Sequence, residues 1–300
     1  MIPICFKEKD SKDKLFHQLI DTTATQKNKI HYVQNIKEID NWCINHIFTN
    51  GKFYSFFDII KADYNEISSI ANAYYLLEDK ISADHKDFII NTLYKRRFPR
   101  KQFVEDLQVT VCPYCNRNFI NSTYKRTMCE LDHFYNKDDY PILAVSFYNL
   151  IPVCHACNHA KAKKDISYSP HNTAFNTDAL LSFDFSFKGL DYLYDNKQIE
   201  IELDSSPDFK FNVEVLKLRE VYQIHSDIVQ EYIKKATIFN PKYLKDLFNT
   251  YYGLFESEEE LYRIVFGNYI EKSSYGKRPL SKFTKDILSK LLKENYGFDI

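Results

Sequence analysis

Four cysteines fall in two CxxC pairs, Cys112 with Cys115 in CPYC and Cys154 with Cys157 in VCHACN. One pair at this spacing serves two unrelated chemistries, because it can be a redox-active dithiol or half of a metal site. A redox pair should open a helix in an α/β fold, which lowers the pKa of its first thiol. Residues 116–127 instead predict a turn followed by a short polar strand or loop, which disfavours the redox interpretation.

The second pair favours a metal site. Four thiolates in a CxxC…CxxC set can surround one Zn²⁺ tetrahedrally, with two ligands from each pair. Such a site is closed to water and substrate, so the predicted zinc ion is structural rather than catalytic. The remaining cysteines, Cys5, Cys43 and Cys129, stand alone, which fits a reducing compartment better than a disulfide framework.

The segment between the two pairs resembles the HNH, or ββα-metal, nuclease family. The matching residues are Leu131-Asp132-His133, Asn149-Leu150, and Cys157-Asn158 followed by Lys161. In that family a zinc-bound form with two flanking CxxC pairs is common. The similar stretch covers residues 108 to 168, and an asparagine, Asn158, fills the third position, where histidine also occurs in the family.

The resemblance implies that Asp132, His133, Asn149 and Asn158 are catalytic. Hydrolysis of a phosphodiester requires a deprotonated water, and a cation that stabilises charge on the phosphoryl group and leaving oxygen. A neutral His133 suits the first task, while Asp132 and Asn158 offer hard oxygens to Mg²⁺ or Mn²⁺. In the family Asn149 steadies the loop and orients the histidine. An asparagine that satisfies a turn is an equally good description of it.

The run NHAKAKKD after Cys157 predicts a helix with phosphate-binding side chains. Lys161, Lys163 and Lys164 behind a metal site are expected to contact the nucleic-acid backbone. His159, which follows Asn158 directly, is a further candidate for a metal ligand or a phosphate contact.

The longer phrase LDHFYNKDDYPILAVSFYNLIPVCHACN is similar to HNH proteins found with ATPase partners in Septu-type and retron-associated anti-phage systems. This similarity implies an effector nuclease that works with an ATPase subunit. The chain contains no Walker motif, so ATP hydrolysis would come from another protein. DNA is the expected substrate by family habit. The alternatives are a ribonuclease, for example one that cuts tRNA, and a catalytically silent module that binds nucleic acid or protein.

Hydrophobic spacing predicts the elements around this module. Apolar residues recur at three and four from about 10 to 100, and again after 213, which indicates packed helices. Asp84 is expected to cap a helix that ends in YKRRFPRK, a basic run that is either a solvated helix end or a phosphate contact. Residues 181–215 alternate and predict two or three strands with a turn at Asp195-Asn196.

These patterns predict a mainly helical α+β protein with a central zinc-stabilised ββα-metal module and a small β region after it. The expected domains are a helical region 1–102, the HNH module 103–175, and a β-then-helical region 176–300. Forty Lys and Arg balance 41 Asp and Glu, so any nucleic-acid surface must be local. No signal peptide and no eighteen-residue apolar run is visible, so a cytoplasmic protein without a membrane partner is expected.

Overall fold

The fold comes from a computed structural model that describes all residues apart from 7, 9, 22–28, 124–126 and 298–300. The backbone groups into two compact units. The N-terminal unit comprises residues 4–108 and 121–173, and the C-terminal unit comprises residues 1–3, 109–120 and 174–300. Most of the first two expected domains, 1–102 and 103–175, therefore lies in the N-terminal unit.

The N-terminal unit begins with a helical region, as the apolar spacing predicts. Sequence-local caps define two of its helices: Ser55 and Asp58 form one capping box, and Asp63 and Glu66 form another. Its elements are α1 (Ser11–Ile20), α2 (Lys29–His46), β1 (Phe48–Thr49), β2 (Lys52–Phe53), α3 (Phe56–Lys61), α4 (Tyr64–Leu76), α5 (Ala83–Asp87), η1 (Phe88–Arg97) and α6 (Arg100–Leu107).

The segment α5–η1 differs from its prediction in two ways. The N-cap is Ser82, whose hydroxyl accepts from the backbone N–H of His85, and Asp84 lies inside the first turn. From Phe88 onwards the helix is wound as a π-helix with i→i+5 hydrogen bonds, a form that is rare over ten residues. The basic run begins in its last turn.

The rest of the N-terminal unit is a hairpin followed by a short helix. Strand β3 (Glu130–His133) pairs antiparallel with β4 (Leu150–Val153), so that Asp132 lies opposite Ile151 and His133 opposite Leu150. The long connection contains two single 3₁₀ turns, η2 (Pro141–Leu143) and η3 (Phe147–Asn149), and α7 (His155–Lys161) follows β4.

An aromatic cluster anchors this hairpin to the helical region. The ring of Phe147, which is fully buried, lies within 6.3 Å of the rings of Phe6, Phe98 and Phe103. The Phe6 pair is edge-to-face and the other two are tilted, and such pairs add a specific attraction to the burial of apolar area. The loop that carries Asn149 is therefore held by packing as well as by hydrogen bonds.

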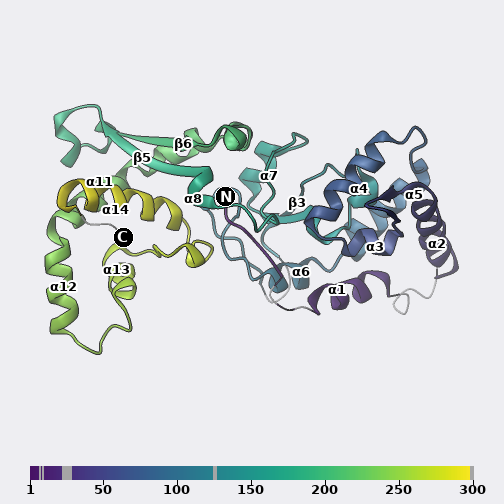
Figure 1. The fold of residues 1–300 in the computed structure, drawn as a ribbon, viewed down its shortest axis with the longest axis horizontal. Coiled ribbons are helices and arrows are strands. Elements are labelled where there is room, and N and C mark those ends of the chain that lie inside the picture. Colours follow the sequence, from purple (N-terminus) through teal and green to yellow (C-terminus); the bar gives the residue numbers. More distant parts are fainter. Residues whose placement is uncertain (7, 9, 22–28, 124–126, 298–300) are drawn as a thin grey trace. The chain divides into compact units, whose positions relative to one another are not determined.

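The C-terminal unit is a two-stranded sheet covered by helices. Strands β5 (Leu181–Phe187) and β6 (Ile199–Ser205) pair antiparallel, and their apolar residues alternate with exposed ones, as the sequence predicts. The connection is longer than the predicted turn, because residues 188–198 form two short 3₁₀ turns, η4 (Leu190–Leu193) and η5 (Asn196–Gln198). Figure 1 shows β5 and β6 side by side, and α14 (Ser281–Tyr296) packs against β5.

The core of the C-terminal unit is aromatic. The ring of Phe183 lies 4.3 Å from that of Tyr222 and 5.3 Å from that of Phe283. The other elements of this unit are α8 (Thr177–Leu180), η6 (Pro207–Phe209), α9 (Lys210–Val215), α10 (Leu218–Tyr222), η7 (Gln223–His225), α11 (Ser226–Ile238), α12 (Pro241–Thr250), α13 (Glu258–Phe266) and η8 (Lys272–Ser274).

The fold class is thus mainly helical α+β with small two-stranded sheets, which confirms the prediction at that level. Among the described residues, no helix combines the length and the apolar character needed to cross a bilayer.

Candidate metal centre and active site

The four paired cysteines form one buried cluster. The sulfur atoms of Cys112, Cys115, Cys154 and Cys157 all lie within 4.8 Å of one another, and none of the four residues is disulfide-bonded. Thiolates at such separations can share one tetrahedral ion, since Zn–S bonds are about 2.3 Å long. The prediction of a four-cysteine site that could hold a zinc ion is confirmed to this extent.

The first pair lies on a tight turn. Asn116 follows it with φ 51°, and its backbone N–H donates to the carbonyl of Cys112 over 2.8 Å. The Asn116 side chain donates to the carbonyl of Tyr275 and accepts from the N–H of Lys282, which ties the turn to the rest of the C-terminal unit, to which it belongs. No helix starts here, so the pKa-lowering geometry of a redox pair is missing from this described segment.

The second pair lies at the start of α7. Cys154 is the N-cap residue, and Cys157 is in the first turn. Spacing of three in a helix puts both thiols on the same side of the chain. Asn158 follows Cys157 directly in α7, so the helix turn that positions this cysteine also positions one predicted active-site residue.

Asp132, His133 and Asn158 line one cavity of about 290 Å³. The residues come from the end of β3 and from α7, which are neighbours in the ββα segment. A further predicted residue, Lys163, also lines this cavity. Three of the four residues expected to be catalytic are therefore brought together.

His133 is held as a neutral base. Its Nε2 lies 3.0 Å from the carbonyl oxygen of Ala144, and because a carbonyl can only accept, this nitrogen carries the hydrogen. Nδ1 is consequently the unprotonated, accepting nitrogen. Burial lowers the pKa of His133 to about 3, with a smaller contribution from the nearby Lys137 charge. The imidazole is therefore unprotonated at neutral pH.

Asn149 does not line the cavity, but its hydrogen bonds support the β3–β4 connection, which forms part of the cavity wall. The side chain is fully buried; its Oδ1 accepts from the N–H of Tyr135 over 2.7 Å, and its Nδ2 donates to the carbonyls of Tyr135 and Leu143. These bonds fix the loop that supplies the Ala144 carbonyl to His133. The two expected roles of Asn149, to steady the loop and to satisfy a turn, are therefore both carried by the same three hydrogen bonds.

Lys161 differs from its expected role. Its side chain is 1% exposed, and its ammonium lies 3.2 Å from an Asp132 carboxylate oxygen and donates to the His133 carbonyl over 2.8 Å. An ammonium held this way pairs with protein groups rather than reaching outward to a phosphate backbone. Lys161 thus links α7 to the end of β3.

Asn158 is oriented by an acidic residue that sequence reasoning missed. Its Nδ2 donates to one carboxylate oxygen of Glu130, while the other accepts from Nδ1 of His155 at 2.8 Å. Burial opposes ionisation of Glu130, but these two hydrogen bonds lower its pKa overall. Because Nδ2 is engaged, Oδ1 is the Asn158 atom left for a cation.

The remaining predicted contacts separate into two groups. Lys163 lines the cavity and pairs with Asp138 at 2.7 Å. His159 and Lys164 are exposed and lie outside the cavity wall; the His159 ring stacks on that of His155 at 6.1 Å.

Tyr94 and Arg100 also belong to the site, although no spacing rule indicates them. The Tyr94 ring lies 4.5 Å from that of His133, and its hydroxyl donates to the Leu131 carbonyl. Arg100 lies 4.3 Å above the Tyr94 ring and donates to its hydroxyl. The available signal was the basic run at 95–101, which contains Arg100.

A second cavity of about 650 Å³ shares Asp138 and Lys163 with the first. Its wall includes Tyr75, which is 71% exposed, and Lys80. Exposed aromatic rings next to lysines are suited to stacking and charge contacts with a nucleic-acid strand.

Comparison with known proteins adds no assignment. No family model, no curated protein and no solved structure matches the chain.

Replacing Cys112 with serine should remove the bound metal. We expect wild-type protein to carry stoichiometric zinc and the Cys112→Ser protein to lose it and melt at a lower temperature, because structural zinc contributes directly to folding. Elemental analysis and thermal unfolding measure both effects. Cys5→Ser, an exposed cysteine outside the cluster, is the control. Full zinc occupancy in Cys112→Ser protein would contradict the assignment.

The Lys161→Met substitution should destabilise the protein by about 3–5 kcal/mol, because it removes the ammonium that pairs with the buried Asp132 carboxylate. Urea denaturation measures the loss, and Lys164→Met, on the exposed neighbour, should change stability little. Adding Asp132→Asn to Lys161→Met should recover part of the loss. If the Lys161→Met and Lys164→Met proteins are equally stable, the buried Lys161–Asp132 pair does not contribute this free energy of unfolding.

The pKa of His133 should make stability depend on pH. The unfolded imidazole, with a pKa near 6.5, binds a proton that the folded form excludes until about pH 3. Stability should therefore be fully present above pH 6.5 and fall on acidification towards pH 3, by up to about 1.4 kcal/mol per pH unit. Denaturation at several pH values should show a shallower slope for His133→Gln. His171, also buried with a lowered pKa, is present in both proteins and cancels.

Proposed function

We propose that this protein is a metal-dependent endonuclease of the HNH type, which hydrolyses phosphodiester bonds in nucleic acid. The observation that carries the proposal is one cavity in which a neutral, oriented His133 lies with Asp132 and Asn158. The zinc-capable cysteine cluster and the residue order of the ββα segment support it further.

His133 would act as the general base. Its Nδ1 would accept a proton from water, while Nε2–H remains bonded to the Ala144 carbonyl. Burial makes the free imidazole a weak base, and a divalent cation held beside it would offset this by making the water more acidic. That bond strengthens as the ring becomes positive, because a carbonyl dipole stabilises an adjacent imidazolium. The neighbouring Tyr94 ring holds the imidazole plane by packing.

Asp132 and the Oδ1 of Asn158 are the groups that would hold a divalent cation. Hard oxygens in a polar cavity suit Mg²⁺ or Mn²⁺, and such an ion stabilises charge on the phosphoryl oxygens and leaving oxygen. The Lys161 ammonium holds the Asp132 carboxylate in place, and the Glu130 contact keeps the Asn158 amide in one orientation. These contacts make the ligand set preorganised rather than dependent on the ion.

The substrate path would extend from the first cavity into the second. Lys163 is common to both walls, and Tyr75 and Lys80 offer stacking and positive charge beyond it. DNA is the proposed polymer, and an anti-phage role with an ATPase subunit is proposed on the similarity of residues 131–158 to such nucleases. An RNA substrate such as tRNA would use the same backbone chemistry.

The His133→Ala protein should cleave about 10²- to 10⁴-fold more slowly than wild type, the usual contribution of a general base. We would incubate both with plasmid DNA, single-stranded DNA and total tRNA, with Mg²⁺ or Mn²⁺, in the presence and absence of the co-encoded ATPase. The polymer that disappears only with an intact His133 is the substrate.

His17→Ala, which removes an exposed histidine from α1, is the matched control and should cleave normally. Equal cleavage by wild-type and His133→Ala protein would refute the catalytic assignment. Binding of nucleic acid by both proteins, with cleavage by neither under any condition, would favour the silent binding module instead.

A further inference from the structure

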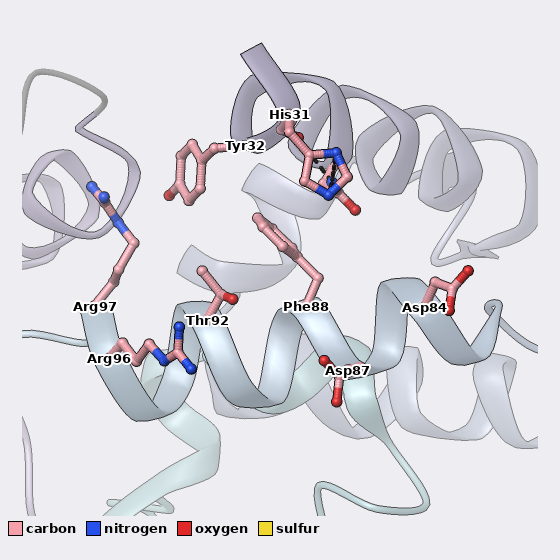
Figure 2. Close-up of a pocket in the computed structure, with 9 residues that line it drawn as sticks. His31, Tyr32, Asp84, Asp87, Phe88, Thr92, Arg96 and Arg97 are labelled. Atoms are coloured by element: carbon pink, nitrogen blue, oxygen red, sulfur yellow. Dashed lines mark hydrogen bonds between the residues drawn. The ribbon is translucent and has the colours of Figure 1, made fainter. Parts of the chain in front are cut away.

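A separate cavity of about 760 Å³ lies in the helical part of the N-terminal unit, between α2 and the continuous helix α5–η1. Its size is typical of a small-molecule site, for which volumes of about 300–1,000 Å³ are usual. Figure 2 shows Tyr32 and His31 from α2 facing Phe88 and Thr92 from η1. None of these residues belongs to the nuclease cavity.

The wall on the η1 side follows a regular spacing. Asp84, Phe88, Thr92 and Arg96 line the cavity at intervals of four residues. An α-helix has about 3.6 residues per turn, so positions four apart drift steadily around it. The i→i+5 bonding of η1 widens each turn, which keeps such positions closer to one line. Asp84 in α5 and the three η1 residues Phe88, Thr92 and Arg96 therefore present an acid, an aromatic ring, a hydroxyl and a guanidinium along one cavity.

The basic end contains two arginines in different states. Arg97 is fixed: its Nε donates to the Leu19 carbonyl at 3.2 Å, its Nη2 donates to the Asp21 carbonyl, and its guanidinium lies 4.6 Å from the Tyr32 ring. Arg96 is exposed and has no hydrogen bond or ion pair to any residue that the structure describes. One placed and one uncommitted guanidinium can together bind a phosphate group.

The middle of the cavity is aromatic with polar groups at its edge. The Tyr32 and Phe88 rings touch, with centroids 5.4 Å apart, and the Tyr32 hydroxyl is already engaged with the Leu19 carbonyl. The buried Asn35 is held by a 2.8 Å hydrogen bond from its Nδ2 to the His31 carbonyl. A planar base could lie against this wall on the half-buried Phe88 ring, with the buried Tyr32 ring packed beside it, since stacking on phenylalanine is tolerated by every base.

The opposite end carries acceptors. Asp84 lies about three turns from Arg96 along the same wall, and its carboxylate is exposed. An acceptor at this distance from the phosphate end suits an exocyclic amine on the far side of the base, which is a donor. A simple anion would use only the arginine end, whereas a phosphorylated nucleoside would use both ends and the aromatic middle.

We propose that this cavity binds a nucleoside phosphate, with its phosphate at Arg96 and Arg97 and its base against Tyr32 and Phe88. This ligand is distinct from the substrate strand of the nuclease cavity, and the proposal does not depend on cleavage activity. The nucleotide could be free in solution or could be the 5′-phosphorylated end of a strand, because both present the same chemistry.

Equilibrium titration of the full chain with AMP, ATP and ribose 5-phosphate tests the proposal. Wild-type protein should bind AMP or ATP, and Arg96→Ala should weaken that binding about ten- to hundredfold, as expected for a lost charge-assisted hydrogen bond. Lys95→Ala is the matched control, because it removes an exposed charge from the adjacent position outside the cavity. Its affinity should stay within about twofold of wild type.

Three results would overturn the proposal: no nucleotide binding at millimolar concentration, equal weakening by Arg96→Ala and Lys95→Ala, or ribose 5-phosphate binding as tightly as AMP. Titration with a 5′-phosphorylated trinucleotide and with its unphosphorylated form shows whether the ligand is a free nucleotide or the end of a strand. Arg96-dependent binding of AMP alone assigns a free nucleotide, and Arg96-dependent binding of the phosphorylated trinucleotide assigns a strand end. All titrations are done without divalent metal and are repeated with the His133→Ala substitution added to each protein, so cleavage of the trinucleotide cannot mimic either outcome.

Discussion

The arrangement of the candidate active site depends on the burial of one ammonium group. Lys161 reaches back from the end of α7 to the Asp132 carboxylate and the His133 carbonyl, with almost no exposure to water. Desolvating an ammonium is costly, and only close partners offset that cost. The position of α7 against β3 is thereby restricted to the one that brings these groups together. That same position carries Asn158 to the cavity.

A second set of hydrogen bonds, on the other side of the cavity, positions His133. Asn149 binds three backbone groups of the connection between β3 and β4, and this connection supplies the carbonyl that selects the tautomer of His133. The side chain that could do chemistry is thus positioned by side chains that cannot reach a substrate. Such supporting contacts are what preorganised sites require, because small misplacements of a reacting group cost large factors in rate.

The spacing of residues along the chain predicted those features of the structure that depend on local geometry. The helical regions and the alternating strands β5 and β6 follow from residues a few positions apart, and the four-cysteine cluster follows from two such local CxxC pairs; the structure confirms all three. Lys161 could not be predicted in the same way, since a lysine in a basic run is ordinarily solvated and only the tertiary position of β3 buries it. Tyr94 reaches the His133 ring from far upstream in the chain, and Arg100 reaches it only through the Tyr94 ring, contacts that no local pattern encodes. The π-winding of η1 likewise has no signal in hydrophobic spacing.

The π-helix η1 contributes to both cavities from different faces. Tyr94 points its ring at His133 and its hydroxyl at the Leu131 carbonyl, while Phe88, Thr92 and Arg96 line the cavity against α2. Widened helical turns place these residues on separate faces within ten positions, which an α-helix of the same length would align differently. The winding of η1 therefore constrains both the packing of the His133 imidazole and the spacing of the residues that line the cavity against α2. A substitution that returned η1 to α-helical winding would displace the Tyr94 ring and break the line from Asp84 to Arg96 at once.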